Sequence, residues 1–236
     1  MKFKLSLLLA SLLCAGIAIA APITGTFQMN GVVTATATTI TWDGVNGTTP
    51  DVFTLSLGTG SFASEDGTNT INNLNDTSQP VGSMFTPYNF IDLTVVPGLP
   101  AMDLNYIPMG NGGSADCTVP ANGTAPPQTC TVAGSPFTLQ NNNVGGAVTG
   151  SSATWTLSGV TSDGLSTWTG VFTSQFVGES YQQVLAALSA SGSVTDSYSA
   201  NVTVTPIATT PEPGTVFLGG MGVLFTILMR RRRSRA

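Results

Sequence analysis

The chain has 236 residues, with seven lysines and arginines, twelve aspartates and glutamates, no histidine and a formal net charge of −5. Its basic side chains are confined to Lys2, Lys4 and the stretch after Met229, so every charged residue between them is acidic. The lack of histidine excludes Ser-His-Asp catalysis and histidine-ligated metals. The lack of lysine in the central part excludes Schiff-base chemistry there. Nothing in this acidic part can neutralise phosphates, which excludes nucleic acid as a partner.

Residues 1–20 have the three parts of a secretory signal peptide. Lys2 and Lys4 form the basic start, residues 5–13 are apolar, and Ala18-Ile19-Ala20 has the small-x-small pattern of a signal-peptidase site. We therefore expect signal peptidase to cleave between Ala20 and Ala21. The alternative is an uncleaved N-terminal anchor, which the shortness of the apolar run disfavours.

Residues 21–206 are expected to form one all-β domain. The segment is rich in Thr, Ser, Gly, Asn and Val, and its short alternating runs are separated by turn-forming residues. This pattern is typical of an antiparallel β-sandwich with jelly-roll or Greek-key-like connections. Alternation also predicts one buried face per strand, as for Phe53, Leu55 and Leu57. The expected strands are 23–29, 32–42, 52–57, 90–96, 153–157, 168–176 and 194–204.

Two cysteines remain once Cys14 leaves with the signal peptide. Cys117 and Cys130 flank an irregular, proline-rich stretch, and in an oxidising compartment they are expected to form a disulfide. A metal or redox pair is the alternative, but the Cys-x-x-Cys spacing is absent and no histidine could assist.

One segment has the period of a helix instead of a strand. Apolar side chains recur at helical spacing at Tyr181, Val184, Leu185 and Leu188. Ser180 and Gln183 match a capping box, and Gly192 is a natural C-terminal stop. We therefore expect one short helix at 180–191, packed on an edge or end of the sandwich.

Acidic side chains offer the only route to acid-base chemistry. The adjacent Glu65 and Asp66, or Asp92 with Asp103, could act as a glycosidase-like pair. A solvated turn and ordinary strand positions explain these residues better. We expect a protein that is not an enzyme and has no cofactor.

Calcium and sugar binding are further alternatives. The turns at 43–47 and 65–69 are rich in oxygen ligands, but neither completes a calcium-loop pattern, so ordinary turns are favoured. Trp42, Trp155 and Trp168 could stack on sugars, yet they stand in alternating runs where core packing is the usual role.

The last part of the sequence combines three features in a fixed order. Pro211-Glu212-Pro213 is followed by an apolar segment at 215–229 and then by arginines, namely Arg230, Arg231, Arg232, Arg233 and Arg235. As a helix, 215–229 would be about 22 Å long, short for a bilayer core of roughly 30 Å. We expect a marginal transmembrane helix preceded by a linker at 207–214 and followed by a basic cytoplasmic tail at 230–236. A permanent tail anchor is the alternative.

These three features, found together with a signal peptide, resemble the PEP-CTERM protein-sorting signal. That family occurs in Gram-negative bacteria that make extracellular polysaccharide. The resemblance covers only the last twenty-six residues. It implies an exosortase, an integral-membrane cysteine protease or transpeptidase, as the processing partner. It also implies that Pro211, Glu212 and Pro213 are the residues recognised.

The function expected from these features is that of an exported cell-surface or extracellular-matrix protein. It would be anchored by its C-terminal helix, processed by the exosortase, and have a structural or interaction role in the envelope or the exopolysaccharide. The alternative is a carbohydrate-binding β-sandwich, with or without Ca²⁺.

Overall fold

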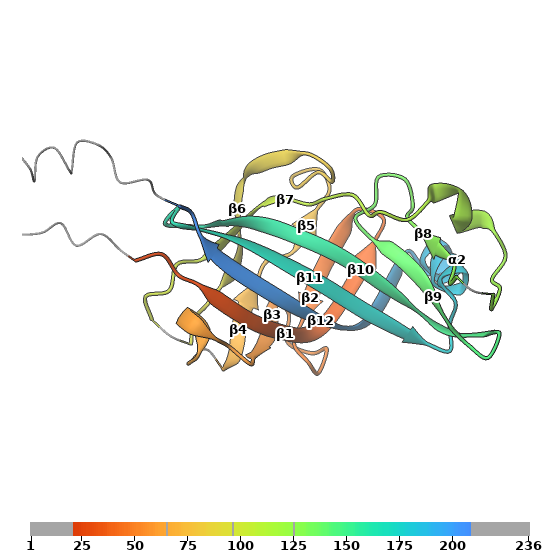
Figure 1. The fold of residues 1–236 in the computed structure, drawn as a ribbon, viewed down its shortest axis with the longest axis horizontal. Helices are drawn as coiled ribbons and strands as arrows, with labels where there is room; N and C mark the ends of the chain where they lie inside the picture. The colour runs from red at the N-terminus through yellow and green to blue at the C-terminus, as the bar shows by residue number, and fades with distance from the viewer. Residues whose placement is uncertain (1–20, 65, 96, 125, 209–236) are drawn as a thin grey trace, which may run out of the picture. The chain divides into compact units, whose positions relative to one another are not determined.

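The computed structural model describes residues 21–64, 66–95, 97–124 and 126–208 (Figure 1). Contacts group the chain as far as Pro206 into one compact unit and Ile207–Ala236 into a second. The predicted signal peptide, sorting motif, membrane segment 215–229 and arginine tail lie outside the described residues. Within the described ranges, no helix combines the length and apolarity needed to cross a membrane.

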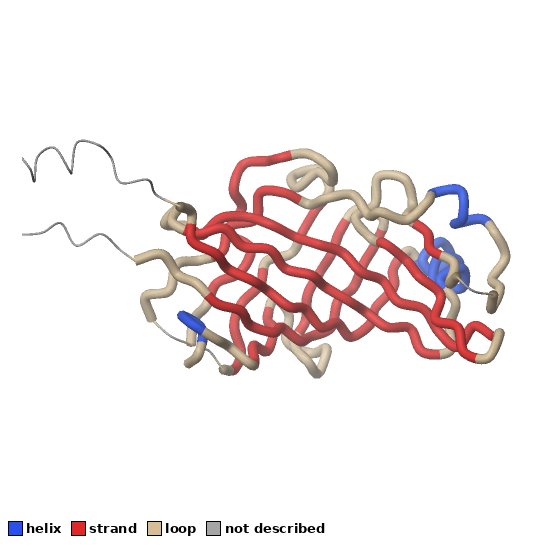
Figure 2. The backbone as a smooth tube through the Cα atoms, viewed as in Figure 1, coloured by secondary structure: helices blue, strands red, loops and turns tan. Residues whose placement is uncertain are grey.

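The described residues of the first unit form an antiparallel β-domain with one α-helix, which confirms the fold class at this level (Figure 2). Two short 3-10 helices, η1 and η2, cover Gly60–Phe62 and Ser114–Thr118, and the α-helix α2 covers Tyr181–Ser191. The strands are β1 Gly25–Thr36, β2 Thr39–Asp43, β3 Val52–Ser56, β4 Gly67–Ile71, β5 Leu74–Asn75, β6 Met84–Asp92, β7 Met102–Tyr106, β8 Thr129–Cys130, β9 Thr138–Val144, β10 Ala147–Thr161, β11 Ser166–Val177 and β12 Ser193–Pro206.

Eight of these strands close into a ring. The pairings run β11–β12–β1–β3–β4–β6–β7–β10, and β10 pairs again with β11. The strands thus form one continuous sheet around a shared core, where the sequence predicted the two sheets of a sandwich. Alternation alone could not separate these arrangements, because each buries one face of every strand.

The long strands β1, β10, β11 and β12 extend beyond the ring. Strand β1 pairs with β3 at residues 28–30 and then with β2 at 32–35. Strand β10 pairs with β9 over 147–154 and with β7 over 158–161. One half of each long strand therefore closes the ring. The other half forms a part of the sheet flanked by β2 on one side and β9 on the other, and helix α2 lies at this end (Figure 1).

An aromatic cluster fills the inner face of the sheet. Trp42 lies at its centre, with ring centroids 5.0 Å from Tyr198, 5.4 Å from Phe172 and 5.8 Å from Phe90. Phe172 and Tyr198 alternate with solvent-facing residues along β11 and β12, so the period-two pattern identifies the buried face there. On β6 the alternation fails, because Phe90 and Ile91 are both buried. Aromatic side chains bury large apolar areas, so this cluster supplies a large part of the apolar surface buried in the core.

Helix α2 begins and ends where the sequence predicts. The Ser180 hydroxyl accepts from the Gln183 N–H at 3.4 Å, and the Gln183 carboxamide oxygen accepts from the Ser180 N–H at 2.8 Å. This is the predicted capping box. Gly192 ends the helix with φ of 80°, a left-handed conformation that glycine adopts without steric cost.

Several predicted boundaries are wrong. The expected strand 32–42 is broken by the turn between β1, which ends at Thr36, and β2, which begins at Thr39, and three other differences have identifiable reasons. Asn30-Gly31 does not interrupt a strand, because Gly31 continues β1 opposite Tyr198, where an added Cβ would lie 2.8 Å from the ring. Strand β6 ends at Asp92 instead of reaching residue 96, since the Asn69 side-chain oxygen accepts from the Thr94 N–H at 2.8 Å. Leu57 follows the end of β3 with φ of 53° and is exposed.

Candidate functional site

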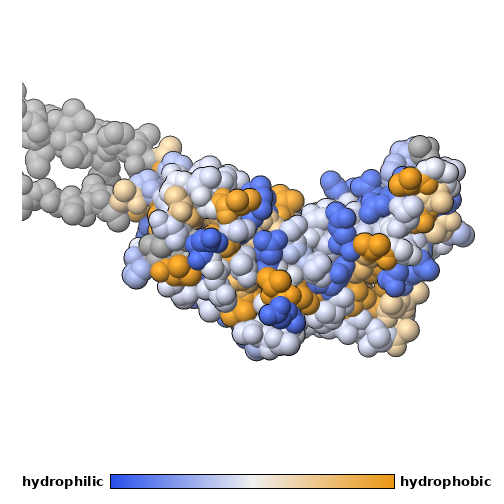
Figure 3. All heavy atoms as spheres, turned by 90° about the horizontal axis from the view of Figure 1, so that it is seen from below, coloured by the Kyte–Doolittle hydropathy of each residue, from blue (hydrophilic) through white to orange (hydrophobic). Residues whose placement is uncertain are grey.

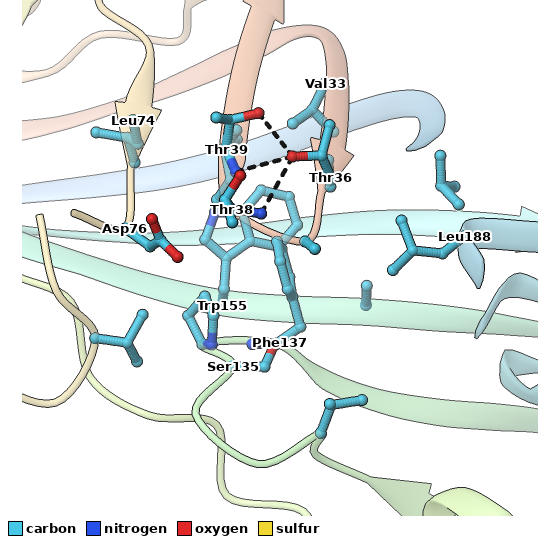
Figure 4. Close-up of a pocket in the computed structure, with 18 of the residues that line it drawn as sticks. Val33, Thr36, Thr38, Thr39, Leu74, Asp76, Ser135, Phe137, Trp155 and Leu188 are labelled. Carbon is cyan, nitrogen blue, oxygen red and sulfur yellow. Dashed lines mark hydrogen bonds between the residues drawn. The ribbon is translucent and has the colours of Figure 1, made fainter. Parts of the chain in front are cut away.

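A pocket of about 340 Å³ opens beside the half of the long strands that lies outside the ring. Its walls are the β1–β2 hairpin, the loop 132–137 before β9, and one face of α2 (Figure 4). A cavity of this size falls in the range that holds small organic ligands. The sheet geometry builds the pocket, because β2 and β9 flank the long strands without pairing to each other in the described residues.

The pocket is lined mainly by apolar side chains. Trp155 supplies an aromatic wall, stacked on Phe172 at a centroid distance of 5.4 Å and meeting Phe137 edge-on at 5.1 Å. Val184, Leu185 and Leu188 face the pocket from α2. The spacing of these three apolar residues predicted the helix. Part of the apolar face of α2 therefore lines the pocket.

The β1–β2 hairpin holds one rim of the pocket in a defined shape. The Thr36 hydroxyl oxygen accepts hydrogen bonds from the N–H groups of Thr38 and Thr39, at 3.2 and 2.9 Å (Figure 4). The hydroxyls of Thr36 and Thr39 lie 2.8 Å apart. Hydrogen bonds from a side chain to nearby main-chain N–H groups fix a tight turn. The conformation of this rim is therefore set by residues within the turn.

Strand β9, on the other side of the pocket from the β1–β2 hairpin, is joined to α2 by buried hydrogen bonds. Asn141 on β9 donates to the side-chain oxygens of Gln128 and Gln182, at 3.0 and 3.1 Å, and accepts from the Tyr181 N–H at 2.9 Å. A disulfide joins Cys117 and Cys130, with their Cα atoms 5.1 Å apart, as the sequence predicts. These links hold η2, β8, β9 and the start of α2 together.

Three residues that line the pocket each carry a buried polar atom with no hydrogen-bond partner among the described residues. These atoms are the Ser174 hydroxyl, the Trp155 indole Nε1 and the Asp196 Oδ2. The Ser174 and Trp155 side chains are each only 3% exposed. Buried polar groups are nearly always paired in folded proteins, so a group of three around one cavity marks a place where a ligand can supply the missing partners.

The electrostatics of the pocket are set by acidic groups. Burial raises the pKa of the Asp196 carboxyl, hydrogen bonds from Ser197 oppose this rise, and the nearby Glu179 adds to it. Asp76 also lines the pocket. Because residues 5–229 contain no lysine, arginine or histidine, no basic side chain of the domain can offset this negative charge.

Apart from Trp155, which lines the pocket, the other sequence-predicted candidates in the described residues lie outside the pocket lining. All three tryptophans are almost fully buried, with Trp42 and Trp168 only 1% exposed, which favours the packing role over sugar stacking. Asp92 is exposed on β6, and Asp103 is half-buried on the neighbouring β7, where burial raises its pKa. The part of the chain that the structure describes contains no group of three histidine, cysteine or acidic side chains placed to hold a metal ion.

The turn at 43–47 is organised by its own backbone. The Gly44 N–H donates to the Thr49 carbonyl at 2.8 Å, and the Gly47 N–H donates to the Gly44 carbonyl at 2.7 Å. The second predicted calcium turn includes Glu65, which lies outside the described residues, as do Ala20, the sorting motif Pro211-Glu212-Pro213 and the arginines from Arg230 to Arg235. Ala21, on the other side of the predicted signal cleavage, is exposed.

Sequence reasoning missed the pocket because its residues come from distant segments. A signal was present: Ser174 and Asp196 occupy inward positions of otherwise apolar alternating strands, next to Phe172 and Tyr198. Polar residues at core-facing positions are departures from the pattern that often mark functional sites.

Comparison with known proteins identifies one segment. The PEP-CTERM protein-sorting motif matches residues 209–233. Neither a curated protein nor a solved structure matches the chain. The motif implies an exported protein that is targeted to an exosortase in the cell envelope. The chain therefore carries a PEP-CTERM sorting motif at residues 209–233, which follows a β-rich domain.

Proposed function

We propose that this chain is a cell-surface or extracellular-matrix protein that an exosortase sorts and processes at its C-terminal signal, and whose β-domain has a non-enzymatic structural or interaction role. The observation that carries the proposal is the match of the sorting motif to residues 209–233. The predicted signal peptide at 1–20 and the wholly acidic central part support export, since basic residues stay at the two ends.

The position of the motif relative to the fold supports processing. The final strand, β12, ends at Pro206, and Pro211-Glu212-Pro213 follows after a short spacer. Two prolines hold a backbone extended and remove hydrogen-bond donors, which suits binding as a strand in a protease cleft. Cleavage near the motif would separate the domain from the apolar segment without cutting any strand.

The test is the mass of the C-terminus in cells and medium, with the exosortase present and absent. We expect the enzyme-containing strain to yield a form that has lost the arginine tail, and the deletion strain to retain it. A matched pair of variants sharpens the test: Glu212→Gln alters the motif, whereas Ile207→Val is a conservative change just before the matched residues 209–233. Intact tails on most of the mature protein, in cells with an active exosortase, would contradict processing.

Carbohydrate binding is the alternative interaction role, and a glycan array of the host's exopolysaccharide fragments would test it. The burial of Trp42, Trp155 and Trp168 weighs against aromatic stacking on sugars by exposed indoles. Array binding that disappears in a variant of a half-buried aromatic residue such as Tyr106→Ala would favour the alternative. Uniformly absent binding would leave the matrix role with a protein or small-molecule partner.

A further inference from the structure

The three pocket-lining residues with unpartnered polar atoms lie on one oblique line of positions across the sheet. Ser174 pairs with Tyr198 across β11 and β12, which puts Asp196 on the inner face as the diagonal neighbour of Ser174. Ala153 pairs with Ser174 across β10 and β11, which puts Trp155 on the other diagonal. Diagonal neighbours in a sheet are roughly 7–8 Å apart. The line Asp196–Ser174–Trp155 therefore runs obliquely over three strands and suits an elongated molecule.

The chemistry along this line differs from one end to the other. Asp196 offers a carboxylate oxygen that can only accept when ionised, whereas the Trp155 indole N–H can only donate. The Ser174 hydroxyl can do either. Apolar surface from Phe137 and from Val184, Leu185 and Leu188 of α2 surrounds them. A complementary ligand needs a donor at the Asp196 end and an apolar body toward Trp155.

Charge decides which donor fits best. Asp76 lines the pocket and Glu179 lies close enough to Asp196 to affect its titration, while residues 5–229 contain no basic side chain. A ligand with a carboxylate or phosphate head group would be repelled by these acidic side chains, and no basic side chain would compensate. A ligand with a neutral head group would gain no electrostatic attraction from them. A protonated amine would be attracted by this field and could hydrogen-bond to Asp196.

We infer that the pocket binds an elongated apolar molecule with a primary-amine head, the amine seated on Asp196 and the apolar body packed between Trp155, Phe137 and α2. This inference concerns the domain itself and goes beyond the sorting role, which depends on residues 209–233. The ligand chemistry is that of a cationic amphiphile of moderate length.

Matched ten-carbon probes test the head group. Decylamine, 1-decanol and decanoate share one chain and differ in charge at pH 7. The full-length protein is held in zwitterionic lipid nanodiscs, because detergent would compete for an apolar pocket, and empty nanodiscs give the background partitioning. Binding is followed by calorimetry and by the fluorescence of the tryptophans. We expect decylamine to bind at least tenfold more tightly than 1-decanol, and decanoate to bind more weakly than either.

Two variants and a control connect binding to the pocket. Asp196→Asn keeps the shape and removes the charge, and should bring decylamine binding within about threefold of 1-decanol. Ala35→Phe fills the pocket from β1 and should abolish binding of all probes. Asp92→Asn removes one acidic charge from exposed β6, outside the pocket lining, and should leave the amine preference intact.

The outcomes separate clearly. Equal binding of the three probes, stronger binding of decanoate, or an amine preference that Asp92→Asn removes as fully as Asp196→Asn would overturn the inference. So would the absence of saturable binding by folded wild-type protein. A circular-dichroism melt of each variant identifies any that fail to fold, and the wild-type probe series decides the question without them.

Discussion

The indole N–H of Trp168 on β11 donates a 3.0 Å hydrogen bond to the main-chain carbonyl oxygen of Asp103 on β7, although β10 lies between these strands. The bond crosses β10 at Gly159, which pairs with Trp168 on one side and Leu104 on the other. A Cβ built on Gly159 would collide with the Asp103 carbonyl and lie 2.8 Å from Trp168 Nε1. The close packing of β7, β10 and β11 in the ring therefore requires a glycine, which has no side chain, at position 159.

We expect Gly159→Ala to destabilise the domain by about 2–4 kcal/mol, since it overpacks the core and breaks a buried hydrogen bond. Ser152→Ala, on the half-buried outer face of the same strand, is the control and should cost little. Urea denaturation followed by tryptophan fluorescence compares the two variants with the wild type. A Gly159→Ala protein as stable as Ser152→Ala would show that the crossing bond is dispensable.

The buried amide of Asn141 should be sensitive to an isosteric change. Asn141→Asp replaces a donor that serves two glutamine oxygens with a further acceptor. The new carboxylate oxygen would then face the two glutamine oxygens with no donated proton between them, and we expect a loss of about 2–3 kcal/mol. Hydrogen exchange should locate the effect at the start of α2, while Asn142→Asp, at the next and less buried position, should leave α2 protected. Unchanged protection of α2 in Asn141→Asp would argue that other contacts hold the helix.

The capping box of α2 can be tested by one hydroxyl. Ser180→Ala removes the acceptor for the Gln183 N–H and should cost about 1 kcal/mol, the usual value for an N-cap. Ser189→Ala, at an exposed position inside the helix, should change stability by less than about 0.5 kcal/mol. Thermal unfolding of both variants gives the comparison, and equal melting temperatures would contradict a stabilising role for the cap.

Local features of this fold were accessible from the sequence, and features that depend on distant pairing were not. The capping box at Ser180 and the disulfide between Cys117 and Cys130 involve residues close in sequence or few in number. The ring closure is different: β10 meets both β7 and β11, and no local pattern encodes which strands become neighbours. The pocket could not be predicted from the sequence for the same reason, because Thr36, Trp155 and Leu188 come together only after the strands are paired.

Gly31 shows that the same residue type can have two structural roles. An Asn-Gly pair between apolar runs is a strong turn signal, yet here glycine makes room for the Tyr198 ring within a continuous strand. The two uses of glycine, for a turn and for close approach, cannot be distinguished until the neighbouring strand is known.

Removing the disulfide should lower stability without changing the sheet. For the 13-residue separation of Cys117 and Cys130, the chain-entropy model gives about 3 kcal/mol. The double variant Cys117→Ser with Cys130→Ser should therefore unfold at lower denaturant, and adding a reductant to the wild type should reproduce the shift. A reductant effect of the same size on the double variant would attribute the change to something other than this bond.

The last prediction concerns pH and the carboxyl of Asp196. Its pKa in the folded domain is raised, chiefly by burial and further by Glu179, against hydrogen bonds from Ser197. The facing side chains add no compensating cation: Val33 lies opposite on β1, α2 carries no charged residue, and Asp76 is acidic. Between the ordinary carboxyl pKa, near 3.9, and the raised value, the folded state binds more protons than the unfolded state. The contribution of Asp196 to stability therefore falls as the pH rises through that window.

Asp196→Asn should accordingly be more stable than the wild type at pH 7, and this difference should shrink as the pH falls toward 3. Asp92→Asn serves as the matched control, because it too removes one negative charge from a domain without basic residues and reports the general repulsion alone. Thermal melts of the three proteins at intervals from pH 3 to pH 8 measure both effects. If the two variants gained the same stability at every pH, burial of the Asp196 carboxyl would make no contribution beyond the general charge repulsion. A gain for Asp196→Asn that grew as the pH fell would reverse the sign of the argument.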